Sequence, residues 1–260
     1  MENANKFSNV FRGLDQAYGT YRIDKEQSNG KQVGKATLVR EPRTVETWEK
    51  HLDGTGNGIG IVPINEDNKC VFGAIDVDTY PLDLTKLVQQ IRKLKLPLVV
   101  CRSKSGGAHC YFFTSQWIDA KAMQEVLNTI ASALGYHGSE VFPKQILLRL
   151  DRGDVGNFLN MPYFNAEKGL RYAIKDDGSA ATLSEFFEMY DQYVQTREQV
   201  SALKIEESVE SPVPDGPPCL QHLCAQKISE GGRNNGLFNV GVYLRKANPE
   251  DWQSEILAYN

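Results

Sequence analysis

Two aspartates interrupt the otherwise apolar run FGAIDVDTY, and their spacing suits the binding of metal ions. Asp76 and Asp78 are two residues apart. Because side chains alternate along a strand, we expect both on one face while Ile75 and Val77 enter a core. At a rise of about 3.3 Å per residue the carboxylates would stand roughly 7 Å apart, and a pair of Mg²⁺ or Mn²⁺ ions would relieve their repulsion. The alternative is a strand end with two solvated aspartates.

A glycine-containing turn is the second segment whose residues could bind a ligand. The segment CRSKSGGAHCYFF predicts a tight turn whose backbone N–H groups converge on an anion such as a triphosphate. The turn consists of Ser103, Lys104, Ser105, Gly106 and Gly107. Arg102 and Lys104 would add charge, and His109 would donate to a phosphate oxygen. The alternative is a glycine hairpin beside a structural histidine.

The order of the predicted elements brings both segments into one α+β domain. The pattern predicts a strand at 71–77, a helix at 83–95, strands at 98–102 and 108–113, a helix at 119–134 and a strand at 140–142. This βαββαβ order folds as two interleaved βαβ units, in an RRM-like antiparallel sheet with both helices on one face. The other face would be free for a ligand and would carry Asp76 and Asp78.

Further elements extend this core on both sides. Before it we expect a helix at 5–14, strands in YGTYRI and KATLV, a helix at 45–52 and a strand at 59–64. After it we expect strand-like NFLNMPYF and GLRYAI, and an amphipathic helix that begins near Leu183. The predicted catalytic domain covers residues 1–202, with the RRM-like core at about 58–175.

Four segments in this order resemble the catalytic core of the archaeo-eukaryotic primase superfamily, in particular its phage and plasmid primase-polymerase branch. They are GNGIGIVPI, FGAIDVD, SKSGGAHCYFF and SEVFPKQ, and the resemblance covers about residues 50–175. In that family a D-x-D/E strand, an S-x-H-type turn and a third acidic residue form a two-metal nucleotidyl-transfer site. The resemblance assigns Asp76 and Asp78 to the first motif, Ser105 and His109 to the second, and Glu140 to the third.

The third acid has alternatives, because the family commonly uses Asp and both Asp151 and Asp154 lie nearby. Glu140 is favoured because it opens the fourth strand of the core. The resemblance implies that Asp76, Asp78 and Glu140 bind two Mg²⁺ or Mn²⁺ ions. The nucleotide-binding residues that it implies are Ser103, Lys104, Ser105, Gly106, Gly107, His109, Lys144 and Arg149.

The activity that the resemblance implies is a DNA primase-polymerase, which adds nucleotides from dNTPs or NTPs to a primer on a single-stranded DNA template.

Two further side chains have open interpretations. Asn160 either approaches sugar or phosphate or is structural, and Tyr111 either stacks on a base or packs in the core.

The C-terminal part has a different composition. Residues 203–218, LKIEESVESPVPDGPP, predict a linker, because they cannot bury enough apolar surface to order themselves. Residues 219–260 predict helices and resemble the start of the helical domain that follows many such primase cores, most clearly at Gly232, Arg233, Asn234 and Asn235. The last predicted helix reaches Asn260 without a stop signal, so we expect a longer polypeptide, with a replicative helicase as a candidate partner.

Composition limits the class of protein. With 260 residues, 41% of them hydrophobic, the chain can bury a sizeable core. No apolar run has the length of a membrane span, and no secretory signal precedes the core, so we expect a cytoplasmic protein. A net charge of −4 argues against coating of nucleic acid by bulk electrostatics. Five cysteines predict reduced thiols, although Cys219, His222 and Cys224 offer a conceivable zinc cluster without a fourth ligand.

Two other classes compete with the primase hypothesis. A non-catalytic single-strand-binding module would also use an RRM-like sheet, but carboxylates on its binding face would repel phosphate. A replication-initiator nuclease would need a paired-histidine metal site, and the sequence has no H-x-H among its four histidines.

Overall fold

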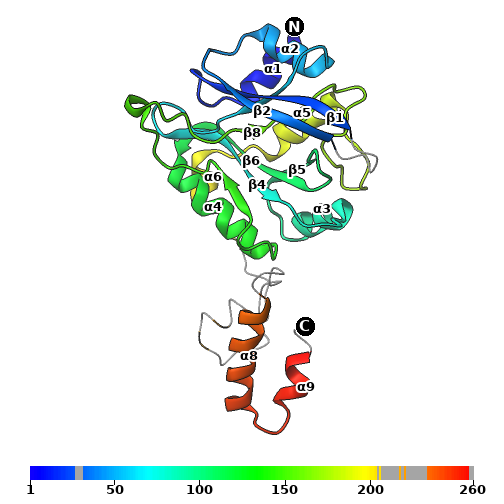
Figure 1. The fold of residues 1–260 in the computed structure, drawn as a ribbon, viewed down its shortest axis with the longest axis vertical. Helices are drawn as coiled ribbons and strands as arrows, with labels where there is room; N and C mark the ends of the chain where they lie inside the picture. Colours follow the sequence, from blue (N-terminus) through cyan, green and yellow to red (C-terminus); the bar gives the residue numbers. More distant parts are fainter. Residues whose placement is uncertain (27–31, 204, 206–216, 218–219, 221–232, 258–260) are drawn as a thin grey trace. The chain divides into compact units, whose positions relative to one another are not determined.

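The computed structural model describes residues 1–26, 32–203, 205, 217, 220 and 233–257 (Figure 1). The chain divides into two units, one of Met1–Ile130 with Ser139–Ile205 and one of Ala131–Gly138 with Glu206–Asn260. Most of the predicted linker, together with Cys219, His222, Cys224 and Gly232, lies outside the described residues. In the part that is described, no helix is both long and apolar enough to cross a membrane.

The predicted βαββαβ core is confirmed. Its elements are β4 (Lys69–Val77), α3 (Leu84–Lys93), β5 (Leu98–Arg102), β6 (Ala108–Asp119), α4 (Ala120–Ala133) and β7 (Glu140–Phe142). The four strands form an antiparallel sheet in the order β5-β6-β4-β7. Each crossover therefore passes over one intervening strand, and right-handed connections bring α3 and α4 to the same face of the sheet.

The helix-covered face is closely packed at β4. Ile75 and Val77 of β4 are fully buried, as their alternation predicts. Gly73 lies so close to α4 that an added Cβ would stand 2.7 Å from Leu127 Cδ1 and 2.8 Å from Met123 Cγ. A side chain at this position would push the helix away, so glycine permits the close contact between strand and helix.

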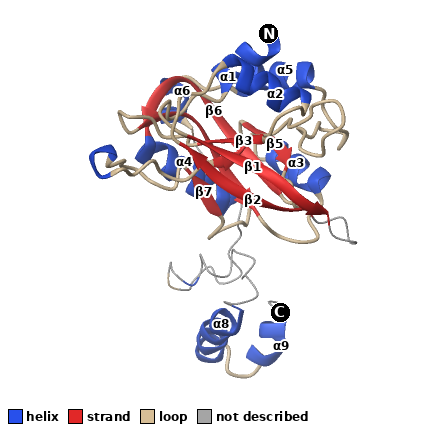
Figure 2. Cartoon of the chain, turned by 45° about the horizontal axis from the view of Figure 1, so that its top comes forward, coloured by secondary structure: helices blue, strands red, loops and turns tan. Residues whose placement is uncertain are grey.

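A second four-stranded antiparallel sheet belongs to the same unit. Its order is β2 (Gln32–Val39), β1 (Tyr18–Glu26), β3 (Gly58–Ile61) and β8 (Leu159–Asn160). Four further helices are α1 (Glu2–Val10), α2 (Val45–Asp53), α5 (Leu183–Tyr193) and α6 (Arg197–Ala202). Figure 2 shows α1, α2 and α5 grouped beside the sheets, and the Phe7 ring of α1 lies 5.5 Å from Trp48 of α2 and 5.8 Å from Phe186 of α5.

The prediction of a free sheet face was wrong over most of that face. Ala74, Tyr111 and Phe113 of the first sheet belong to one hydrophobic cluster with Ile59 of β3 and with Phe11, which follows α1. The Phe11 ring lies 5.3 Å from the Tyr111 ring and 5.6 Å from the Phe113 ring. Burial of the large apolar side chains on this face is favourable, and residues of α1, α2 and α5 cover them. The end that carries Asp76 and His109 opens into a pocket.

The smaller unit contains α8 (Arg233–Ala247) and α9 (Trp252–Leu257). A small apolar cluster of Leu220, Val240 and Leu244 holds them together, with Trp252 and Ile256 packed against it. Arg233, Asn234 and Asn235 lie in the first turn of α8.

Candidate active site

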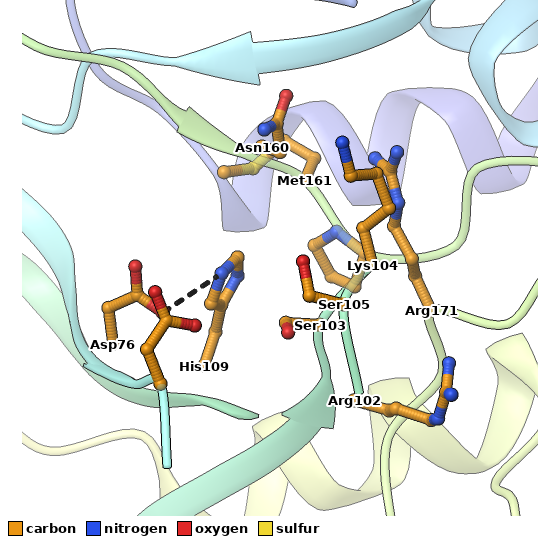
Figure 3. Close-up of a pocket in the computed structure, with 11 residues that line it drawn as sticks. Asp76, Arg102, Ser103, Lys104, Ser105, His109, Asn160, Met161 and Arg171 are labelled. Carbon is orange, nitrogen blue, oxygen red and sulfur yellow. Dashed lines mark ion pairs between the residues drawn. The ribbon is translucent and has the colours of Figure 1, made fainter. Parts of the chain in front are cut away.

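One pocket lies where strands of the two sheets meet. It is bounded by the ends of β4 and β5, the start of β6, and β8 of the second sheet, and its volume is about 220 Å³. Its lining residues are Asp76, Asp78, Arg102, Ser103, Lys104, Ser105, His109, Asn160, Met161, Pro162 and Arg171. Figure 3 shows Asp76 and His109 on one side of the pocket and Lys104 and Arg171 on the other. We call these the acidic side and the basic side.

Strand register builds the acidic side. Asp76 of β4 is paired with His109 of β6 and with Glu140 of β7, so these three side chains leave the sheet on one face. Asp78 follows directly after the end of β4 and also lines the pocket. Burial, followed by the charges of Asp78 and Glu140, raises the pKa of Asp76 to about 7. The acids are therefore close enough to repel one another.

Glu140 stands beside Asp76 but outside the pocket lining. Its carboxylate forms an ion pair with Lys144, with Nζ 2.6 Å from Oε2, and the Glu140 side chain is 62% exposed. Among the described residues, no three His, Cys, Asp or Glu side chains stand close enough together to hold a metal ion. Asp151 and Asp154, the sequence alternatives to Glu140, do not line the pocket.

His109 lies between an acid and a buried tyrosine. Its Nε2 is 3.5 Å from Asp76 Oδ1, and its Nδ1 is 3.3 Å from the Tyr111 hydroxyl. Burial, with a smaller effect of Arg171, lowers the pKa of His109 to about 4. The imidazole is therefore neutral at neutral pH, so its contact with Asp76 is not an ion pair. Tyr111 is 0% exposed and donates to the Asn160 carbonyl oxygen at 3.4 Å, so it packs in the core.

The two glycines of the turn have different explanations, a positive φ at Gly106 and a close approach to β4 at Gly107. The Ser103 N–H donates to the Gly107 carbonyl at 2.8 Å, and the Gly106 N–H donates to the Ser103 carbonyl at 3.2 Å. Gly106 has a φ of 93°, which favours glycine. A Cβ on Gly107 would stand 2.4 Å from the Val77 carbonyl oxygen and 3.3 Å from Asp78 Oδ1. The turn can therefore reach the acids only without that atom.

Tyr80 connects the turn to the acids. Its hydroxyl donates to Asp78 Oδ1 at 3.0 Å and also interacts with the Ser105 side chain. The ring itself is 53% exposed beside the pocket residues that it contacts. Sequence reasoning missed Tyr80, although its position two residues after Asp78 was a usable signal.

The basic side has three cations and no acid. Arg102, Lys104 and Arg171 line the pocket, and in the described ranges none of them has a carboxylate within the 4.0 Å of an ion pair. Arg171 is only 7% exposed, and burial lowers its pKa. The Lys104 ammonium lies 3.8 Å from the centroid of the Tyr21 ring and donates to the Tyr21 hydroxyl.

Several buried polar atoms of this pocket lack a partner. In the part of the chain that the structure describes, five buried side-chain N or O atoms have no hydrogen-bond partner. Three of the five, Ser103 Oγ, Asn160 Oδ1 and Arg171 Nη1, belong to residues that line the pocket. Each such atom costs about 1–3 kcal/mol when it stays unpaired. Their concentration in one pocket indicates a polar ligand.

The structure thus assembles most of the predicted site residues. Asp76, Asp78, Ser103, Lys104, Ser105 and His109 line one pocket, and Gly106 and Gly107 shape its turn. Lys144 and Arg149 are not brought into the pocket. Arg171 was missed, and its signal in the sequence was weak: a single cation within the otherwise strand-like segment GLRYAI.

Comparison with solved structures finds a similarity to a protein described as the catalytic domain of primase Repb′ in complex with initiator DNA. The TM-score is 0.35 and the sequence identity is 11%, and the alignment covers 74% of this chain and 95% of that chain. No curated protein matches the sequence.

A family model described as "TOTE conflict system, Archaeo-Eukaryotic Primase domain" matches residues 4–207. The match spans well over half of the chain and contains every residue of the pocket. It confirms the superfamily that the sequence motifs resemble, while a phage or plasmid origin stays a prediction. The chain therefore belongs to the archaeo-eukaryotic primase family, and its function is of the primase, nucleotidyltransferase type.

Proposed function

We propose that this chain is a DNA primase-polymerase that copies a single-stranded DNA template from nucleoside triphosphates. In this reaction a 3′-hydroxyl attacks the α-phosphate of the incoming nucleotide, a phosphodiester bond forms, and pyrophosphate leaves. The family supports the general class of reaction. The polymerase activity, the two divalent ions, the DNA template and a helicase partner are the finer parts of the proposal.

The observation that carries the proposal is the opposite charge of the two sides of one pocket. A nucleoside triphosphate that reacts with divalent ions needs carboxylates for the ions and cations for the phosphates. The acidic side supplies Asp76 and Asp78, and the basic side supplies Arg102, Lys104 and Arg171. At about 220 Å³ the pocket is smaller than the roughly 300–1,000 Å³ of pockets that enclose drug-sized ligands. It therefore suits the phosphates, with the base outside.

The residue types on the acidic side suit a pair of Mg²⁺ or Mn²⁺ ions, although the three acids do not converge in this structure. Carboxylate oxygens are the ligands that these hard cations prefer. The pKa of Asp76 is raised by burial and then by the charges of Asp78 and Glu140, and a bound cation would favour the charged carboxylate. Asp76, Asp78 and Glu140 would hold the ions, and Glu140 would have to turn away from Lys144 to join. Bound there, the ions would activate the attacking hydroxyl and stabilise charge on the leaving pyrophosphate.

The other side chains bind and orient the nucleotide. Lys104 and Arg171 would bind the β- and γ-phosphates, and the turn from Ser103 to Gly107 offers the unpaired Ser103 hydroxyl. The Arg102 guanidinium donates to the Leu170 carbonyl oxygen at 3.3 Å and would add positive charge at the edge of the site. His109 is neutral, so it acts as a hydrogen-bonding group next to Asp76 without adding charge. Lys144 holds Glu140, and this is the role that we propose for it in place of phosphate binding.

The competing classes gain no support. A single-strand-binding module would need accessible aromatic rings on its sheet, whereas Tyr111 and Phe113 are fully buried. A replication-initiator nuclease would need paired histidines at a metal. Of the described histidines, His51 is buried and does not line the pocket, with Nε2 2.8 Å from the Pro162 carbonyl oxygen and Nδ1 accepting from the Ile59 N–H.

Primer extension tests the proposal. A labelled primer on a single-stranded DNA template is incubated with the chain, dNTPs or NTPs, and Mg²⁺ or Mn²⁺. We expect elongated products from the wild-type chain and none from Asp78→Asn, a variant of nearly the same size without the charge. Retardation of the template without synthesis would instead establish the binding module, and nicking would establish the nuclease.

A further inference from the structure

The cations of the basic side must be held in place by something other than acids. Lysine and arginine side chains are flexible, and ordering them costs conformational entropy. A carboxylate partner would order them but would compete with phosphate for their charge. In the described part of the chain, neither Lys104 nor Arg171 has such a partner within 4.0 Å.

An aromatic ring takes that place. Tyr21 of β1 is 8% exposed, and its ring lies beneath the Lys104 ammonium at 3.8 Å from centroid to Nζ. The Tyr21 hydroxyl accepts a hydrogen bond from the same ammonium. The Arg171 guanidinium lies 6.0 Å from the centroid of the Tyr21 ring and 5.7 Å from that of Phe164. One ring from the second sheet thus contacts two of the three pocket cations.

The ring position is set by the second sheet. Tyr21 pairs with Gly58 of β3, and a Cβ on Gly58 would stand 3.5 Å from Arg171 Nη1. Arg171 therefore packs over the backbone of β3 beside Tyr21, and its Nη1 still has no hydrogen-bond partner. The arrangement fixes the guanidinium through packing and leaves Nη1 buried without a hydrogen-bond partner.

We propose that Tyr21 is a positioning residue that holds Lys104 and Arg171 in place without neutralising them. The face of an aromatic ring attracts a cation through its quadrupole but carries no net charge. Both cations therefore keep their full charge for the phosphates of the nucleotide. This inference rests on the proposed function, and it extends that function to a residue of the N-terminal strands, outside the segments that resemble the primase motifs.

The inference predicts that Tyr21 acts on the binding of polyphosphate. Two ordered cations would contact more than one phosphate. Their loss should therefore weaken the binding of a triphosphate far more than the binding of a nucleoside monophosphate. Because Tyr21 does not line the pocket itself, its substitution should raise the KM for nucleotides and change kcat little. If Tyr21 contributed only to stability, its substitution would not raise KM selectively while kcat stayed nearly constant.

Calorimetric titration of inorganic tripolyphosphate into the full chain, without divalent ions, tests the inference directly. We expect Tyr21→Leu and Lys104→Gln each to weaken binding about 10-fold or more. Tyr18→Leu is the matched control, because Tyr18 lies on the same strand and packs against the central hydrophobic cluster instead. Wild-type affinity in Tyr21→Leu, with the loss confined to Lys104→Gln, would overturn the inference while the proposed function stands.

A conservative variant keeps the test decisive if Tyr21→Leu does not fold. Tyr21→Phe retains the ring and removes only the hydroxyl that Lys104 contacts. We expect it to weaken tripolyphosphate binding about two- to fivefold in the wild-type chain and to have no effect in the Lys104→Gln background. An equal loss in both backgrounds would overturn the inference. A wild-type chain that neither binds tripolyphosphate nor extends primers would overturn the proposed function itself.

Discussion

The two sides of the pocket are built in opposite ways. On the acidic side, Asp76 and Glu140 sit opposite each other on neighbouring strands of one sheet, and their charges repel. On the basic side, Lys104 and Arg171 come from distant segments and rest on the Tyr21 ring of the other sheet. The acidic side therefore depends on a cation that would relieve repulsion, whereas the basic side depends on how the two sheets pack. Substitutions on the acidic side should therefore reduce the rate of nucleotide incorporation, and substitutions on the basic side should weaken nucleotide binding.

The largest effect is expected from Asp76→Asn. Loss of this carboxylate should reduce nucleotide incorporation roughly 1,000-fold or more, because ions that stabilise the transition state contribute several kcal/mol. The thermal midpoint should not fall, since Asp76 repels Asp78 and Glu140. Single-nucleotide incorporation and a thermal melt measure the two quantities. A stable variant with wild-type incorporation would remove the acidic side from the chemistry.

Gly107→Ala should act on the contact between the two sides. The added Cβ would stand 2.4 Å from the Val77 carbonyl oxygen, so the turn must shift away from the acids. We expect a destabilisation of about 1–3 kcal/mol and a fall in incorporation of about 100-fold. Gly106→Ala is the control, because its Cβ would meet only Arg102 Nη2, at 3.6 Å. Its positive φ should still cost about 1 kcal/mol, with little loss of activity. Denaturant unfolding measures the loss of stability in each variant, and incorporation assays measure the effect of moving the turn away from the acids.

Arg171→Gln should impair the basic side alone. With one buried donor removed, the KM for nucleotides should rise about 10-fold while kcat stays within a few-fold of the wild type. Arg152→Gln, an exposed arginine of the short 3₁₀ helix at Leu150–Arg152, should leave both constants unchanged. Steady-state kinetics over a range of nucleotide concentrations make the distinction. A loss of kcat at constant KM would assign Arg171 to the acidic side's chemistry instead.

The smallest effect is expected from Tyr111→Phe. The hydroxyl of Tyr111 contacts His109 Nδ1 at 3.3 Å and so helps to direct Nε2 toward Asp76. Its removal should lower incorporation a few-fold and leave the aromatic packing unchanged. In a His109→Ala background the same substitution should have no further effect. If the two losses instead multiplied, Tyr111 would act independently of His109.

Sequence periodicity predicted part of the acidic side. The period of two in the run from Ile75 to Asp78 predicts which side chains share a face, and the βαββαβ order makes β7 a neighbour of β4. Glu140 was assigned by the family resemblance, and the structure pairs it with Asp76. The turn at Ser103–Gly107 is equally local, since glycine at positions 106 and 107 marks it.

The basic side and the covered sheet face could not be predicted in the same way. Arg171 reaches the pocket because the segment after β8 returns to pair with β5, as the Cys101–Ala173 bridge records. Tyr21 contributes through the pairing of β1 with β3. Both are tertiary contacts without a periodic signal. Phe7 and Phe11 did carry a hint, because large apolar side chains near the N-terminus needed a surface to cover.

The central claim is that one pocket holds divalent ions on its acidic side and a triphosphate on its basic side. Crystals soaked with MnCl₂ and a nonhydrolysable deoxynucleoside triphosphate test both halves at once, because an anomalous difference map locates the manganese and the difference electron density locates the triphosphate. The account predicts manganese peaks at Asp76 and Asp78, with the β- and γ-phosphates against Lys104 and Arg171. Manganese or triphosphate bound elsewhere, with these four side chains left without a ligand, would contradict it.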